Sequence, residues 1–213
     1  MTVERKRIGW GFGLMWVFLS AMGWFMGFVM GLLVGFAPIE LIGQTPLGVM
    51  LASCVHAIVL GAVVGIFQWV VLRERVPGAG RWVWASTAGL AVAGGVGGAV
   101  VMAGANAELG EGGSLAAVVG YTLVGALGGA VTGMLQRPVL RGQVSRSGWW
   151  VLASTMGWGL GMAVFGIGEY ASGAFGIMEP AGVLFGWLVS GVVLGAVTGG
   201  ALVWLLRQPV PEA

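Results

Sequence analysis

The sequence is short of charge. Only 8% of its 213 residues are Asp, Glu, Lys or Arg, while 58% are hydrophobic. A typical soluble domain carries roughly 25% charged residues. A water-soluble fold of this length with so few charges could not cover its surface with polar groups. The composition therefore predicts that lipid surrounds most of the chain.

Cysteine and histidine are equally scarce, with one of each, Cys54 and His56. A single cysteine excludes an internal disulfide and a cysteine-rich metal site, and a single imidazole leaves little for metal binding through histidine. The sequence also has no nucleophile elbow, no phosphate-binding glycine loop and no two-histidine metal spacing. We therefore predict no enzymatic activity, no cofactor and no metal. The few basic residues also exclude nucleic-acid binding.

Six long apolar runs are present instead. A helix needs about 20 apolar residues to cross the hydrocarbon core of a bilayer. Six stretches meet this length without a charge in their interiors: 10–36, 47–72, 82–105, 114–135, 149–167 and 181–206. The connections between them are short, which favours antiparallel neighbours. The predicted fold is all-α, a six-helix transmembrane bundle in a single integral membrane domain.

Basic residues mark one side of this bundle. All ten Lys and Arg residues precede the first run, lie in every second connection, or follow the last run. The other three connections carry only acids, namely Glu40, Glu108, Glu111, Glu169 and Glu179. Because Lys and Arg are retained in cytoplasmic loops, we expect a multi-pass protein of the cell (inner) membrane with both termini in the cytoplasm. The first run is longer than a signal-peptide core, so we expect it to be retained.

A pattern recurs along the chain at a period of roughly 67 residues. The sequence Gly-Ala-Val-x-Gly occupies 61–65, 129–133 and 195–199, near the end of every second run. In the other runs, Trp16, Trp82 and Trp150 are each followed by Val and then by Ser and Gly at fixed spacing. We interpret the chain as three copies of one helical hairpin, approximately 8–75, 76–143 and 144–208. Three copies close most simply around a pseudo-threefold axis.

Two segments carry a family resemblance, 68–73 (QWVVLR) and 150–154 (WVLAS). They resemble a bacterial group of Gly/Trp-rich polytopic membrane proteins without a characterised activity. Through the repeat, the resemblance covers most of the chain, but it implies no catalytic residues. The three-hairpin plan is also similar in outline to mitochondrial carriers. The proline-acidic-basic signature of that family is missing here, which argues against homology.

Polar side chains inside the predicted helices are candidates for a ligand site, because burying them in a membrane is costly. Gln68 and Gln136 occupy equivalent repeat positions, where the third copy has Leu202. The full set of candidates is Gln68, Gln136, His56, Ser86, Ser154, Glu40 and Glu108, the two glutamates lining a possible acidic vestibule. A structural alternative stays open for each. Glutamines can link helices, serines can bond back to the preceding turn, and outer loops simply lack positive charge.

Tryptophan and glycine are abundant, with 11 and 42 residues. Eight tryptophans fall near the predicted cytoplasmic helix ends and predict an interfacial aromatic belt: Trp10, Trp16, Trp69, Trp82, Trp84, Trp149, Trp150 and Trp204. Glycines recur every four residues in several runs, which predicts close helix packing. The connection 168–181 is predicted as the longest outer loop, with a partly folded cap.

Two functions remain open. The first is a non-enzymatic protein that binds or passes a small or lipid-like ligand within the bundle; a conduit of this kind predicts a polar, hydrated cavity along the axis. The alternative is an accessory subunit that packs on a larger membrane complex, or on a second copy, through its glycine faces. That role predicts a dry axis and glycine stripes on the outer surface.

Overall fold

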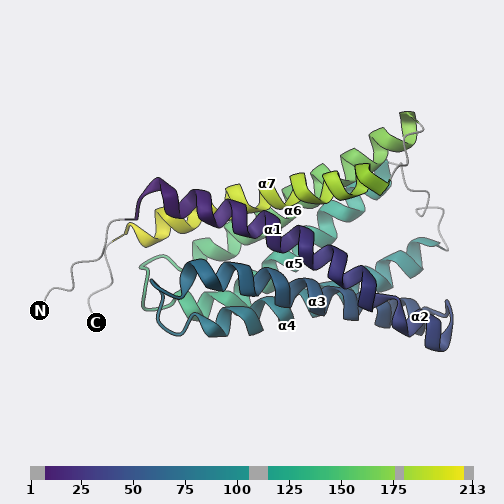
Figure 1. Cartoon of the computed structure of the whole chain (residues 1–213), viewed down its shortest axis with the longest axis horizontal. Coiled ribbons are helices and arrows are strands. Elements are labelled where there is room, and N and C mark those ends of the chain that lie inside the picture. Colours follow the sequence, from purple (N-terminus) through teal and green to yellow (C-terminus); the bar gives the residue numbers. More distant parts are fainter. Residues whose placement is uncertain (1–7, 106–114, 176–179, 209–213) are drawn as a thin grey trace, which may run out of the picture.

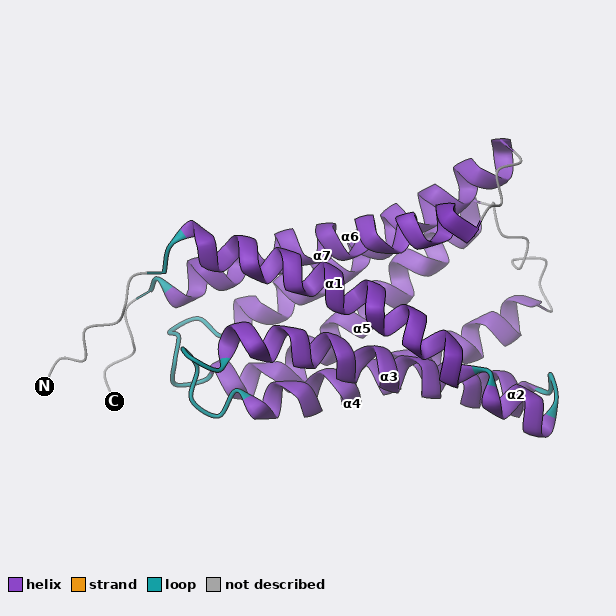
Figure 2. Ribbon diagram, viewed as in Figure 1, coloured by secondary structure: helices purple, strands orange, loops and turns teal. Residues whose placement is uncertain are grey.

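A computed structural model describes residues 8–105, 115–175 and 180–208 (Figure 1). These residues form seven helices and no strand (Figure 2). The helices are α1 (Trp10–Gly35), α2 (Ala37–Ile42), α3 (Pro46–Leu72), α4 (Gly80–Ala105), α5 (Leu115–Leu140), α6 (Gly148–Phe175) and α7 (Pro180–Leu206). The six long helices have 26 to 28 residues. At 1.5 Å per residue, each exceeds the roughly 30 Å of a hydrocarbon core.

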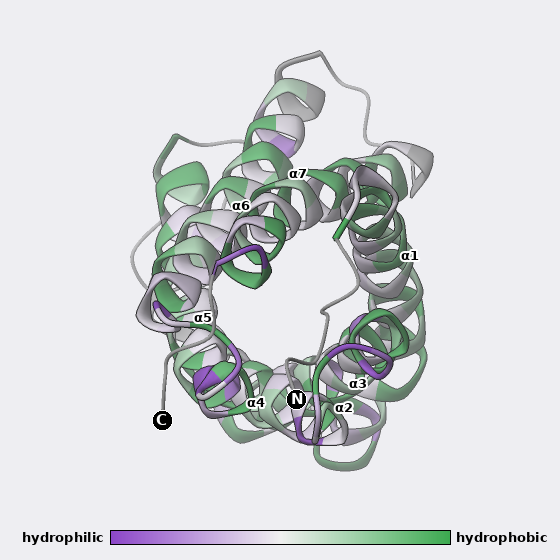
Figure 3. Ribbon diagram, turned by 90° about the vertical axis from the view of Figure 1, so that its left-hand side faces the viewer, coloured by the Kyte–Doolittle hydropathy of each residue, from purple (hydrophilic) through white to green (hydrophobic). Residues whose placement is uncertain are grey.

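The six long helices form a closed ring in the order α1, α3, α4, α5, α6, α7 (Figure 3). Each helix packs on the next, and α7 packs on α1. The three hairpins, α1 with α3, α4 with α5 and α6 with α7, thus alternate with three contacts between hairpins. The start of α1 and the end of α7 lie at the same end of the ring as the α3–α4 and α5–α6 connections (Figure 1). We call this the basic end, because Arg73, Arg81, Arg141 and Arg207 lie there. The all-α bundle is therefore confirmed.

Length and composition allow most of these helices to span a membrane. Among the described residues, α1 with α2, α3, α5, α6 and α7 are long and apolar enough. Helix α4 has 26 residues and packs between α3 and α5 in the same ring. Large hydrophobic side chains cover the outside of the ring, including Leu14, Phe18 and Phe185, each more than 60% exposed. An apolar surface of this extent is suited to lipid.

Glycine stripes lie at the contacts between helices. Gly23, Gly27, Gly31 and Gly35 of α1 are all buried against α3. A Cβ added at Gly27 would lie 3.1 Å from the Cα of Leu60. Stripes on α5 and α7 face α6 and α1 in the same way. The absent side chains let neighbouring backbones approach, as the four-residue spacing predicts.

Two predicted connections are helical instead. Residues 168–175, predicted as loop, continue α6 to Phe175, because no proline interrupts the hydrogen-bond ladder there. Residues 37–42, also predicted as connection, form the short helix α2, with a proline in its first turn. Helix α3 then starts at Pro46, where the Thr45 hydroxyl accepts a hydrogen bond from the Gly48 amide at 3.1 Å. This contact caps the helix.

The last helix, α7, lies one turn out of the register that the sequence repeat predicts. Gly61 of α3 and Gly129 of α5 make equivalent contacts with the helix that follows. On α7, the equivalent contact with α1 is made by Gly191, whereas the sequence repeat aligns Gly195 with the other two. The contacted residues are Ser86, Thr87 and Leu90 for the first, Ser154 and Trp158 for the second, and Ala21 and Trp24 for the third. The difference is four residues, about one helical turn.

This slip changes which residues of the third repeat are structurally equivalent to those of the first two. Leu202, which the sequence aligns with Gln68 and Gln136, belongs to the apolar cluster that also contains Leu72 and Leu140. The residue level with the two glutamines is therefore one turn earlier on α7, at Thr198. The prediction that Leu202 is equivalent to Gln68 and Gln136 is wrong, because α7 is shifted by one turn relative to the alignment of the three sequence repeats.

Candidate functional site: two cavities on the bundle axis

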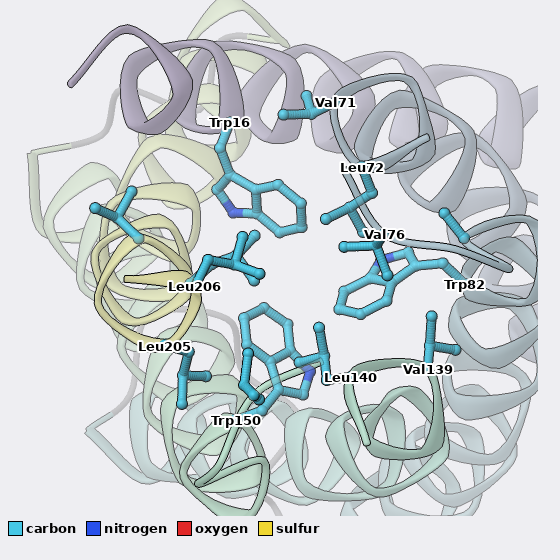
Figure 4. Packing of buried hydrophobic residues seen from close by; sticks show 14 of the residues in the cluster. Trp16, Val71, Leu72, Val76, Trp82, Val139, Leu140, Trp150, Leu205 and Leu206 are labelled. Carbon is cyan, nitrogen blue, oxygen red and sulfur yellow. The ribbon is translucent and has the colours of Figure 1, made fainter. Parts of the chain in front are cut away.

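Three tryptophans meet on the axis near the basic end, one from each repeat. Trp16, Trp82 and Trp150 point toward one another (Figure 4) and are at most 1% exposed. Their ring centroids lie 6.0 Å, 6.1 Å and 5.1 Å apart for the three pairs. Two of the pairs are edge-to-face, a favourable geometry for aromatic rings. We call these residues the tryptophan triad.

The triad corrects the predicted aromatic belt. Trp16, Trp82 and Trp150 are core residues rather than lipid-facing anchors. Their indole N–H groups find acceptors inside the bundle, so they have no need of the headgroup region. The belt interpretation still fits tryptophans that face outward, such as Trp10 and Trp84, which are 78% and 77% exposed.

Apolar layers close the basic end beyond the triad. The first contains Leu72, Leu140 and Leu202, all 0% exposed. The second contains Val76, Val144 and Leu206, at most 5% exposed. Val76 and Val144 come from the connections after α3 and α5, which fold back beneath the ring. The axis is therefore packed with side chains at this end (Figure 4).

A polar layer lies on the other side of the triad. Trp82 and Trp150 donate their indole N–H to the side-chain oxygens of Gln68 and Gln136, both at 2.9 Å. The glutamines in turn donate to the hydroxyls of Ser20 and Ser86, at 3.2 Å and 2.9 Å. Each glutamine thus links three helices. These contacts correspond to the linking role that the sequence left open for the glutamines.

The third branch of this layer differs. Trp16 donates its indole N–H to the Thr198 hydroxyl at 3.0 Å. That hydroxyl donates to the carbonyl of Leu194, one turn earlier, at 2.7 Å. Threonine is shorter than glutamine and has no side-chain amide that could donate to a serine on the neighbouring helix. Ser154, the counterpart of Ser20 and Ser86, therefore receives no amide hydrogen bond.

A small polar cavity lies within this layer. Its volume is about 10 Å³, measured as space open to the centre of a water molecule. Four of the predicted ligand-site residues line it, namely Gln68, Gln136, Ser86 and Ser154, together with Thr132 and Thr198. The structure thus brings together four candidates that are far apart in sequence. A space of this size holds about one water molecule.

A second, much larger cavity opens beyond the polar layer, toward the end opposite the basic end. Its volume is about 580 Å³, within the range of pockets that hold drug-sized ligands. Trp24, Trp158 and Trp187 separate it from the polar layer. The walls are mainly small and apolar: Gly31, Gly35, Ala52, Ala57, Ala93, Gly94, Gly97, Gly98, Ala116, Gly120 and Gly128. We call this space the outer cavity.

The remaining predicted site residues lie apart from the polar layer. His56 lines the outer cavity, and its ring centroid is 5.6 Å from that of Phe28. Glu40 is exposed on α2, and Glu108 lies outside the described residues. Glu169, the other described candidate for an acidic vestibule, is half-buried on α6. In the described part of the chain, no group of three His, Cys, Asp or Glu residues is placed to hold a metal ion.

Comparison with known proteins adds no relative. No protein-family model matches the chain, and no curated protein or solved structure is significantly similar to it. The two cavities are therefore the features of this chain that point to a function.

Sequence reasoning missed the tryptophan triad and the outer cavity. The triad had a signal, because Trp16, Trp82 and Trp150 recur at equivalent repeat positions, while Trp84 and Trp149 do not. The outer cavity had none. Small residues that line a cavity and small residues that pack helices together have the same spacing in the sequence.

Proposed function

We propose that this chain is an integral membrane protein that binds one lipid-like molecule in the outer cavity. The observation that carries the proposal is the cavity itself, about 580 Å³ in volume and walled by apolar side chains. An aliphatic or isoprenoid chain gains by leaving water for such a space. The basic side chains at the opposite end support an orientation with both termini in the cytoplasm of the cell membrane, so the cavity belongs to the outer leaflet.

The closed basic end favours binding over passage. The tryptophan triad and the two apolar layers fill the axis there. The outer cavity is also apolar rather than the polar, hydrated cavity expected of a conduit. A lipid-like molecule that entered it would stop at the tryptophan floor formed by Trp24, Trp158 and Trp187.

The polar side chains of the outer cavity suggest where the head of the ligand lies. Ser53 and His56 line it from α3, and Tyr121 lines it from α5. The His56 ring hydrogen-bonds to the Gly31 backbone, which leaves its other ring nitrogen for the head of a ligand. We therefore propose an amphipathic ligand, with a hydrogen-bonding head near His56 and an apolar body against the glycine and alanine walls.

The alternative role, an accessory subunit that docks through its glycine faces, has less support. The stripes on α1, α5 and α7 lie between helices of the ring. They are therefore occupied by contacts within the chain and do not face a partner.

The test is to purify the protein in a mild detergent and identify co-purified lipids by native mass spectrometry. The variant Gly120→Phe fills the cavity. Gly120 lines it, and a Cβ added there meets no atom within 4 Å. Gly200→Phe is the matched control, since Gly200 is exposed on α7, is equally open and does not line the cavity.

We expect about one bound lipid-like molecule per chain in the wild type and in Gly200→Phe, and loss of that molecule in Gly120→Phe. His56→Leu should retain apolar molecules and lose selectivity for the head group. A wild-type protein that carries no such molecule, or a Gly120→Phe variant that carries the same one, would refute the proposal.

A further inference from the structure

We propose that the small polar cavity binds one ordered water molecule, which completes the third branch of the polar layer. The site is independent of the outer cavity and of the function proposed for it. It lies between the tryptophan triad and the floor of the outer cavity, in a part of the bundle where every polar group must find its partner inside the protein.

The three repeats differ in the polar layer. In two of them a glutamine accepts from a tryptophan and donates to a serine. In the third repeat, Thr198 accepts a hydrogen bond from Trp16 but has no amide that could donate to Ser154. Ser154 is 1% exposed, and within the described structure its hydroxyl makes no hydrogen bond. The side chain of Ser154 lines the small cavity, and an internal hydroxyl without a partner is costly unless a water molecule reaches it.

The cavity has the right size and chemistry for a water at this point. Ser154 and Thr198 both line it, so the cavity occupies the place of the amide that Thr198 lacks. Its volume of about 10 Å³ is close to the minimum that holds one water. Gln68, Ser86, Thr132 and Gln136 also line it, which supplies the two to four polar partners that a buried water needs.

Water fits this site better than a cation does. The amides and hydroxyls that line the cavity are neutral, and no carboxylate lines it to balance a positive charge inside the bilayer. A water can also accept a hydrogen bond from the Ser154 hydroxyl, which a cation cannot do. The Thr132 hydroxyl, buried and without a partner, is a second candidate donor after a small rotation.

The one-turn slip of α7 gives a sharp test. Thr198→Gln places an amide where Gln68 and Gln136 have theirs, and the added side-chain volume is about that of one water. The new oxygen would accept from Trp16 and the new amide would donate to Ser154, which expels the water. Leu202→Gln is the matched control, because the sequence repeat aligns position 202 with the glutamines but the structure places it in the apolar layer.

A crystal structure at a resolution that shows ordered waters should reveal one peak within hydrogen-bonding distance of Ser154 Oγ in the wild type and none in Thr198→Gln. Thr198→Gln should keep the wild-type Tm or exceed it, whereas Leu202→Gln should lower the Tm. An empty cavity in the wild type, or the same peak in both proteins, would overturn the proposal.

Serine variants provide a second measurement that does not need a crystal. If water binds Ser154, Ser154→Ala should lower the Tm by about 2–4 °C, as should Ser20→Ala and Ser86→Ala, because each breaks a satisfied hydrogen bond. If the cavity is dry, Ser154→Ala removes an unsatisfied hydroxyl and leaves the Tm unchanged or raises it. That result would contradict the proposal.

Discussion

The hydrogen bond between Gln68 and Trp82 offers a direct measure of what holds the ring together. Replacing Gln68 with leucine keeps a similar volume and removes both the acceptor for Trp82 and the donor to Ser20. Interhelical hydrogen bonds in membranes contribute about 0.6 kcal/mol on average and about 1.7 at most. Two such bonds give an expected loss of about 1–3 kcal/mol in the free energy of unfolding.

A double-mutant cycle isolates one of the two bonds. Gln68→Leu, Trp82→Phe and the double variant are unfolded reversibly in mixed micelles by a denaturing detergent. We expect a coupling energy of about 0.6–1.7 kcal/mol between the two positions, because the indole N–H and the amide oxygen are partners at 2.9 Å.

The control pairs Gln68→Leu with Trp84→Phe. Trp84 lies two residues from Trp82 in the sequence but is 77% exposed, so its coupling to Gln68 should be near zero. Additive losses for Gln68→Leu and Trp82→Phe would refute the role of this bond. An equal coupling to Trp84 would show that the cycle reports general loosening of the helices.

Three further predictions follow from packing and topology. Gly129→Ala should lower the Tm markedly, because the added Cβ would lie 2.5 Å from the Ser154 carbonyl oxygen. Gly120→Ala should leave the Tm unchanged, because a Cβ there meets no atom within 4 Å, and thermal unfolding in detergent compares the two variants. Trp82→Phe should destabilise the protein and Trp84→Phe should change the free energy of unfolding by less than about 0.5 kcal/mol, a contrast that would vanish if both rings faced lipid. In a Cys54→Ser background, an impermeant thiol reagent applied to whole cells should label Gln44→Cys and not Glu74→Cys; labelling of both from one side would reject the topology.

Much of the fold follows from the sequence because the membrane imposes a simple rule. The cost of burying a charge confines Arg73, Arg141 and Arg207 to the ends of apolar runs, and that alone predicts the number and direction of the long helices. Helix ends are predicted less well. Residues 168–175 remain helical because a helix can continue past the bilayer surface when no proline stops it.

The candidate site is predicted only in part. The cost of buried polar groups correctly draws attention to Gln68, Gln136, Ser86 and Ser154, which the structure brings together. Their partners could not be predicted, because the sequence repeat assigns Leu202 to a position that Thr198 occupies. A slip of one turn leaves the glycine spacing intact, since the stripe on α7 repeats every four residues, so the sequence pattern is the same in either register.

The contact between α7 and α1 has a consequence for biogenesis. Trp16 reaches across the chain to Thr198, and the Arg207 guanidinium donates to the Ile8 carbonyl at 2.9 Å. As helices leave the ribosome in order, α1 inserts first, yet it must keep one flank open to lipid until α7 arrives. The ring therefore cannot close during synthesis. A nascent chain arrested before α7 would present Val17, Ala21 and Trp24, which contact α7 in the closed ring, to the bilayer.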